Sequence, residues 1–290
     1  GEHDWEQDTF MTPHGMRIAP GVIRIWGGVR DKAGISRIKY IDVDENNPSN
    51  VLYVSQKPAL DIGKPGCFDD NGVILGDILP VGDKFYLYYV GFQHVEKVKF
   101  YAFSGLAIST NQGETFERYS EVPLMDRTDE GRFGRCIHTM LYEDGIFKCY
   151  YAVINDWKII NRTPYPVYNI WYTTSEDGIT FKRKDDCLCV DVMGDEYRIG
   201  RPKVYRLSDG YEMYYTRDLV SKDYLVGYAV SKDGIHWQRK DSLIGLSKSD
   251  IGWDSEMACY PVKLIANNDV FLFYNGNGMG KTGVGYASLE

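Results

Sequence analysis

Short runs of alternating hydrophobic and polar residues, separated by polar turns that contain glycine, extend along the whole chain. One phrase recurs: an alternating strand that ends at a serine, a polar turn with a glycine, and an aromatic residue that begins the returning strand. Full copies occupy residues 105–118, 171–183 and 227–239, and a truncated copy occupies 283–288. Each copy predicts a β-hairpin, and no helical periodicity of comparable length competes with it.

A second arrangement precedes each copy: a polar or charged entry, a β run, a short turn and an aromatic strand. The entries at 69–73, 134–138, 200–204 and 254–257 lead to aromatic strands at 85–89, 147–151, 211–215 and 270–274. Residues 21–26 and 37–43 suggest a fifth unit with a degenerate turn. The repeats predict an all-β fold, a five-bladed β-propeller with four-stranded antiparallel blades around a central funnel, in one domain spanning 1–290.

Composition narrows the ligands that such a funnel could take. Hydrophobic residues make up 43% of the chain and aromatic residues 14%, enough for a core and a binding surface. The net charge of −8 repels phosphate backbones and anionic lipids, so neither a nucleic acid nor a membrane is an expected partner. The expected partner is a carbohydrate or a sugar phosphate.

The cysteines and the first residues indicate the compartment. None of the 6 cysteines has zinc-site spacing, so reduced, buried thiols are expected, with no metal and no cofactor. The acidic start of the chain and the lack of a long apolar run favour a soluble, cytoplasmic protein, or a secreted one if a signal peptide has been removed.

The phrase Ser-x-Asp-Gly-x-x-Trp/Phe and the tyrosine-rich strands resemble the five-bladed-propeller glycoside hydrolases, which include arabinanases, xylosidases, invertases and β-mannoside phosphorylases. As a repeat pattern, the resemblance covers nearly the whole chain. Residues 67–73 resemble the phosphorylase segment Glu-Asp-Pro-Arg-Ile, with Asn71 and Gly72 in place of its Pro and Arg. The resemblance implies that Asp70 occupies the position of that family's catalytic aspartate.

Glycosidic bond cleavage needs a protonated acid at the leaving oxygen, and a base, a nucleophile or a phosphate on the other face. The carboxylate candidates are Asp70, Glu196 and Glu256, each of which could instead cap a turn or pair with an arginine. Asp69 competes with Asp70, but strand alternation sends the two side chains to opposite faces. We expect Asp70, Arg135, Arg201 and Glu256 to converge on the funnel.

The remaining candidates would bind the substrate. Guanidinium groups can hold a carboxylate, a phosphate or paired hydroxyls, and an indole can stack on a sugar ring. The predicted binding residues are Arg30, Arg135, His138, Arg201, Trp253 and Asn275. The leading hypothesis is a glycoside hydrolase, with a phosphate-dependent phosphorylase or transferase and a non-catalytic carbohydrate-binding propeller as alternatives.

Overall fold

The computed structural model describes residues 2–221, 224–266 and 269–289. Strands dominate these residues, which confirms the predicted all-β fold. The helical segments are short: η1 (Asp4–Glu6), η2 (Arg183–Asp185), η3 (Asp241–Leu243) and α1 (Asn277–Gly280). Within the described ranges, no helix has the length and hydrophobicity needed to cross a bilayer.

The strands form five consecutive antiparallel sets. The first set comprises β1 (Asp8–Ala19), β2 (Val22–Arg30), β3 (Ser36–Asp44) and β4 (Val51–Val54). The second comprises β5 (Val73–Val81), β6 (Lys84–Gln93), β7 (Tyr101–Ser109) and β8 (Glu117–Arg118). The third comprises β9 (Gly134–Glu143), β10 (Ile146–Ile160), β11 (Thr163–Ser175) and β12 (Cys187–Val190). The fourth comprises β13 (Glu196–Leu207), β14 (Gly210–Leu219), β15 (Tyr224–Ser231) and β16 (Trp237–Arg239), and the fifth β17 (Cys259–Ala266), β18 (Asp269–Asn275) and β19 (Val284–Leu289).

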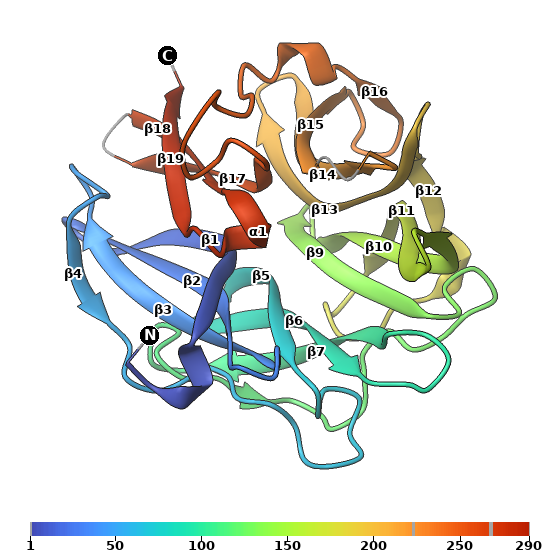
Figure 1. Cartoon of the computed structure of the whole chain (residues 1–290), viewed down its shortest axis with the longest axis horizontal. Helices are drawn as coiled ribbons and strands as arrows, with labels where there is room; N and C mark the ends of the chain where they lie inside the picture. The colour runs from blue at the N-terminus through green and yellow to red at the C-terminus, as the bar shows by residue number, and fades with distance from the viewer. Residues whose placement is uncertain (1, 222–223, 267–268, 290) are drawn as a thin grey trace.

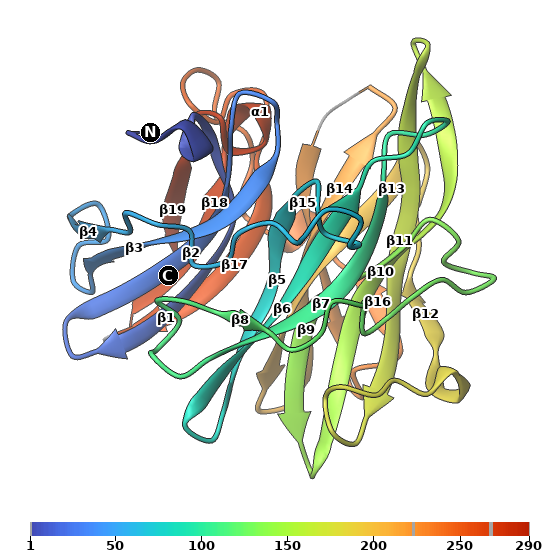
Figure 2. The ribbon, with the colours of Figure 1, turned by 90° about the horizontal axis from the view of Figure 1, so that it is seen from below.

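Figure 1 shows the five sets following one another in chain order about a common centre, with the first strand of each set nearest to it. Short parallel bridges join the second set to the third, between β7 and β9, and the third to the fourth, between β11 and β13. Figure 2 shows the hairpin of β10 and β11 projecting beyond the neighbouring strands. Heads of inner strands from different sets therefore lie close together.

The recurring serine phrase forms the hairpin turns that the sequence predicts, because its polar atoms cap the turn. In the fourth set, the Ser231 hydroxyl accepts hydrogen bonds from the backbone N–H groups of Asp233 (3.3 Å) and Gly234 (2.9 Å). One carboxylate oxygen of Asp233 accepts two more, from Ile235 and His236, each at 2.8 Å. Asx and serine turns of this kind favour a reversal over continued extension.

The same turns also connect neighbouring sets. Each turn glycine has a positive φ, and its carbonyl accepts a hydrogen bond from an aromatic side chain on the second strand of the preceding set. The bonds run from Trp26 to Gly113 (2.7 Å), from Tyr88 to Gly178 (3.1 Å) and from Tyr150 to Gly234 (2.9 Å). All of these aromatic rings are completely buried, so they also contribute to the hydrophobic core between the sets.

Every inner strand carries an extra residue relative to its partner strand at a corresponding place in each set, and β1 and β13 have further shifts elsewhere. The shifts in pairing fall between Met11 and His14, Leu75 and Asp77, Ile137 and Thr139, Gly200 and Lys203, and Cys259 and Val262. Such β-bulges turn a side chain out of its normal alternation and are frequent beside functional sites. Here they decide which side chains face the centre.

Candidate functional site

A cavity of about 280 Å³ lies among the inner strands and the β10–β11 hairpin. Its volume is near the lower end of the range for small-ligand pockets. Its lining includes four basic residues: Arg30, Lys99, Arg198 and Arg201. Among the described residues that line the cavity there is no aspartate and no glutamate.

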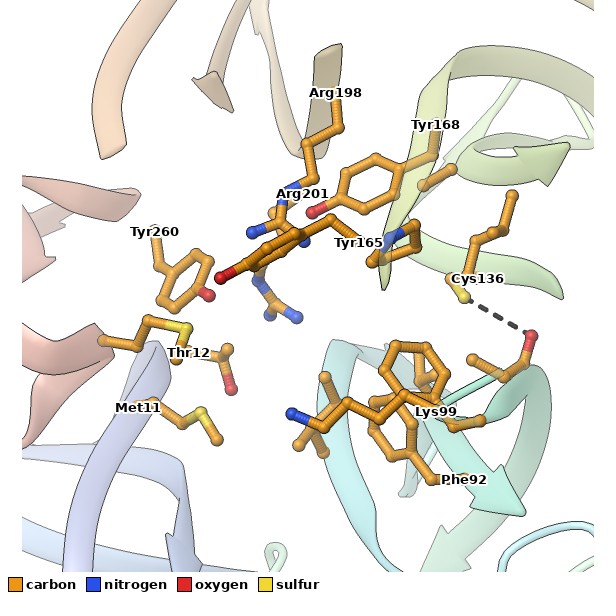
Figure 3. Close-up of a pocket in the computed structure, with 18 of the residues that line it drawn as sticks. Met11, Thr12, Phe92, Lys99, Cys136, Tyr165, Tyr168, Arg198, Arg201 and Tyr260 are labelled. Atoms are coloured by element: carbon orange, nitrogen blue, oxygen red, sulfur yellow. Dashed lines mark hydrogen bonds between the residues drawn. The ribbon is translucent and has the colours of Figure 1, made fainter. Parts of the chain in front are cut away.

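Three bulge residues on different sets line this cavity with a left-handed backbone: Thr12 (φ 56°), Arg201 (φ 54°) and Tyr260 (φ 55°). Each stands directly before a proline, which cannot continue the ladder of hydrogen bonds. A positive φ is unfavourable for residues with a Cβ, and such strain is concentrated at functional sites. Figure 3 shows these three side chains around one space.

The cavity also collects buried polar atoms that lack a hydrogen-bond partner. They are the Thr12 hydroxyl, Nδ1 of His138 and Nη1 of Arg201. Thr12, His138 and Arg201 are 1%, 4% and 8% exposed, so solvent does not readily replace the missing partners. Since buried polar groups are normally paired, this grouping indicates a ligand that accepts and donates hydrogen bonds.

Arg201 is the most unusual of these groups. Its Nη2 donates to the Leu75 carbonyl at 2.7 Å, and its guanidinium lies 5.3 Å from the centre of the Tyr260 ring. No carboxylate among the described residues forms an ion pair with it. Burial lowers the pKa of Arg201 to about 10. The guanidinium stays charged at neutral pH, so the cavity holds an uncompensated positive charge.

Two nearby basic groups, Arg198 and Lys203, differ from Arg201 because carboxylates neutralise them. Arg198 donates to Oδ2 of Asp218 through Nε (2.8 Å) and Nη2 (2.6 Å). Lys203, behind the cavity, donates to Oδ1 of Asp77 at 2.8 Å. The pKa of His138 is held well below its usual range, first by burial and then by Arg201 and Lys203, so its imidazole is neutral.

Of the binding residues predicted from the sequence, Arg30, His138 and Arg201 line the cavity. Arg135 is buried but points elsewhere, donating to Asp186 at 2.9 Å. The Trp253 ring packs on Tyr274, with 5.1 Å between their centres.

Asn275 has its amide fully engaged with backbone. It accepts from Thr12 N–H at 2.8 Å and donates to the Phe10 and Gly283 carbonyls at 2.6 and 3.1 Å. It therefore holds the strained segment at Thr12 and joins the fifth set to the first.

None of the predicted carboxylates is among the residues that line the cavity. Asp70 lies in the loop before β5, where it accepts from Gly66 N–H at 2.8 Å. Glu256 is exposed, in the loop before β17. Glu196 is buried against Arg239, with oxygen–nitrogen distances of 2.6 and 2.7 Å. Burial opposes its ionisation, but Arg239 and the Met193 N–H hold the pKa of Glu196 below its usual range.

Several cavity residues are not among the site residues predicted from the sequence: Thr12, Lys99, Tyr165, Tyr168, Arg198, Tyr224 and Tyr260. The signal for two of them was a proline inside a strand pattern, at Thr12-Pro13 and Tyr260-Pro261. Tyr165 comes from the β10–β11 hairpin, which is longer than the corresponding hairpins of the other sets. The repeat pattern therefore does not predict its position. The six cysteines form no disulfide; Cys136, Cys149 and Cys259 are buried as predicted, whereas Cys67, Cys187 and Cys189 are partly exposed. Within the described ranges, no cluster of side chains is suited to hold a metal ion.

No family model matches the chain. The uncharacterized protein Rv1502 of Mycobacterium tuberculosis is 31% identical over all of this chain and 95% of its own length. The chain belongs to the same family as Rv1502. A 1,2-beta-oligomannan phosphorylase of Thermoanaerobacter is 26% identical over 46% of this chain and 47% of its own length.

Solved structures with similar folds include glycoside hydrolases and a member of a mannoside phosphorylase family, so the predicted resemblance to these enzymes is confirmed at the level of the fold. A glycoside hydrolase matches with a TM-score of 0.77 at 16% identity, covering 100% of this chain and 89% of that one. A thermostable family-43 glycoside hydrolase matches with 0.74 at 17%, covering 99% and 91%. A structure from a mannoside phosphorylase family matches with 0.69 at 15%, covering 99% and 85%.

Proposed function

We propose that this protein is a glycoside-active enzyme that holds inorganic phosphate, or the phosphate of a sugar phosphate, in the central cavity and transfers a glycosyl group to or from it. The proposal includes a fold assignment: the five strand sets are the blades of one closed propeller spanning 1–290. The inner strands then bring Thr12, His138 and Arg201 to one funnel, as a shared ligand would require.

The observation that carries the proposal is the Arg201 guanidinium, which has no ion-pair partner in a cavity whose described lining includes no aspartate or glutamate. A buried charge is costly unless it is paired, and a phosphate oxygen is a strong acceptor for a guanidinium. The unpartnered Thr12 hydroxyl can donate to the same anion. The neutral His138 ring can also donate one N–H, depending on its tautomer.

A cavity whose described lining has no pair of carboxylates fits phosphorolysis better than hydrolysis. Hydrolysis by the common mechanisms needs two carboxylates on either side of the glycosidic bond. In phosphorolysis, the phosphate itself attacks the anomeric carbon, so one of these two is not required. Asp70 takes the role of the acid in this proposal, and its loop leads directly into β5, whose Ile74 lines the cavity.

Calorimetric titration with inorganic phosphate tests the proposal. We expect phosphate to bind the wild-type protein, and Arg201→Met to weaken binding at least about tenfold, since a buried charge-assisted contact contributes more than ~1.4 kcal/mol. Arg132→Met is the matched control, because Arg132 is exposed and donates only to the Asn155 carbonyl. Equal phosphate affinity in all three proteins would refute a phosphate site at Arg201.

A turnover assay then separates the enzymatic hypotheses. Release of glycosyl phosphate that depends on added phosphate supports phosphorolysis. Phosphate-independent release of free sugar would establish the hydrolase instead. Sugar binding without turnover under either condition would establish the non-catalytic alternative.

A further inference from the structure

The cavity has an apolar arm that the phosphate proposal does not use. It is formed by residues of the second and third strand sets, and Figure 3 places Phe92 and Cys136 away from Arg198 and Arg201, with Lys99 beside Phe92. Its lining residues are Phe92, Phe100, Ala102, Cys136, Ala152 and Ile154. Four of these, Ala102, Cys136, Ala152 and Ile154, belong with Val90 to one hydrophobic cluster, and the two phenylalanines pack against it.

Two of the side chains that line this arm are small and buried. Ala102 and Ala152 are 1% and 3% exposed, on neighbouring sets. Protein interiors are normally packed to crystal density, so an apolar space bounded by alanines and reached from a polar cavity is typical of a ligand pocket. Burial raises the pKa of the Cys136 thiol to about 12, so it contributes apolar surface and not a nucleophile.

Aromatic rings form the outer wall of the arm in a fixed orientation. Phe100 meets Phe92 edge-to-face at 5.1 Å and Trp157 edge-to-face at 5.3 Å. Trp157 lies on the β10–β11 hairpin but does not line the cavity. Pro164 and Pro166 lie on the same hairpin and do line it. An edge-to-face cluster that still exposes ring surface is complementary to one more aromatic ring.

On the basis of the proposed function, we propose that this arm binds the aglycone and that the substrates are aryl glycosides. Phosphate at Arg201 and an aromatic aglycone beside Phe100 would then lie on opposite sides of the sugar. A phosphate oxygen forms a bond to the anomeric carbon while the bond from that carbon to the phenolic oxygen breaks. The bonding pair leaves with the oxygen as a phenolate.

This substrate class also agrees with the chemistry of the cavity lining. A phenol has a pKa near 10, far below that of an alkyl alcohol, so a phenolate departs with little help from an acid. A cavity that presents cations but no described carboxylate is suited to such a leaving group.

Kinetics with paired substrates test the inference. A panel of 4-nitrophenyl and methyl glycosides of the same sugars is assayed in inorganic phosphate, with binding followed by calorimetry. We expect the aryl member of at least one pair to bind at least about tenfold more tightly and to release 4-nitrophenolate only when phosphate is present. Phe100→Leu raises KM or Kd for that aryl glycoside about tenfold, since it removes an aromatic contact and apolar area.

Phe133→Leu is the matched control. Phe133 also packs on Trp157, at 6.4 Å between ring centres, and against the same hydrophobic cluster as Phe100, but it is not among the residues that line the cavity. Equal binding of aryl and methyl glycosides, or equal effects of the two substitutions, would overturn the aglycone assignment. Phosphate affinity in the same proteins reports on Arg201 separately, so the two proposals can fail independently.

Discussion

Replacing Arg201 by methionine should stabilise the ligand-free protein while weakening its affinity for phosphate at least about tenfold. Burial lowers the pKa of Arg201 from 12.5 to about 10. At about 1.4 kcal/mol per pH unit, the buried charge costs about 3 kcal/mol of folding free energy. The guanidinium is protonated in both the folded and the unfolded chain at pH 7, so the whole cost is present there; it declines only as pH rises from about 10 toward 12.5.

Part of this gain is lost again. Methionine cannot donate to the Leu75 carbonyl, which then stays buried without its 2.7 Å partner at a cost of about 1–2 kcal/mol. The flexible thioether fills most of the vacated space. The free energy of unfolding should therefore rise by about 1–2 kcal/mol, measured by urea denaturation.

Lys203→Met is the informative control, because Lys203 is an equally buried cation that has a partner. Its ammonium donates to Asp77 at 2.8 Å and to the Gly76 carbonyl at 2.7 Å. Removing it leaves a buried carboxylate without its cation, which typically costs about 3–5 kcal/mol. The two substitutions should thus shift the unfolding midpoint in opposite directions.

Phosphate should reverse the order of wild type and Arg201→Met. A ligand at about 100 times its Kd stabilises the protein that binds it by about 2.7 kcal/mol and leaves a non-binding variant unchanged. The wild type should then become the more stable of the two in saturating phosphate. If Arg201→Met destabilises the free protein as much as Lys203→Met does, Arg201 is a structural residue and the reasoning fails.

Three further predictions concern other residues of the cavity and its surroundings. Because burial holds the pKa of His138 below its usual range, the unfolded chain takes up a proton first as pH falls below about 6.5, and His138→Gln should reduce the resulting loss of stability; an identical urea midpoint-versus-pH slope in both proteins would contradict this. If Asp70 is the acid, Asp70→Asn should slow phenyl glycosides more than 4-nitrophenyl glycosides, whose leaving group needs less protonation; equal small losses in kcat would remove it from that role. Asn275→Ala should lower the free energy of unfolding by about 2–4 kcal/mol, since two carbonyls and one N–H lose their partner, and an unchanged urea midpoint would show that the fifth and first sets are held in another way.

The hairpins could be predicted from sequence because their causes are local. The turn is capped by its own residues, Ser231, Asp233 and Gly234, so the residue types at these positions are enough to predict it. The hydrogen bond from Tyr150 to the Gly234 carbonyl is not local, since it spans 84 positions. Both residues nevertheless lie in repeated segments, so the regular spacing of the repeat brings them to equivalent places in neighbouring sets.

The site was harder to predict because similar dipeptides lie at different positions relative to the β-bulge of their strands. Gly134-Arg135 and Gly200-Arg201 look equivalent in sequence, and both were expected to face the funnel. In the sheets, Thr139 pairs with Tyr150 and Lys203 pairs with the matching Tyr214, which makes Ile137 the counterpart of Arg201. Arg135 therefore lies two residues further from the bulge and meets Asp186 instead.

Local strain and unsatisfied polarity coincide at Thr12 and Arg201, and this coincidence is the strongest reason to treat the cavity as a functional site. Each feature alone has a structural explanation: a bulge can produce a positive φ, and packing can trap a polar atom. At Thr12 and Arg201, however, a strained backbone and an unpaired buried polar atom occur in the same residue, on separate strand sets around one cavity. Ligand binding accounts for both features together. The carboxylates differ: Asp77, Glu196 and Asp218 each form an ion pair with a lysine or an arginine, whereas no described carboxylate pairs with Arg201.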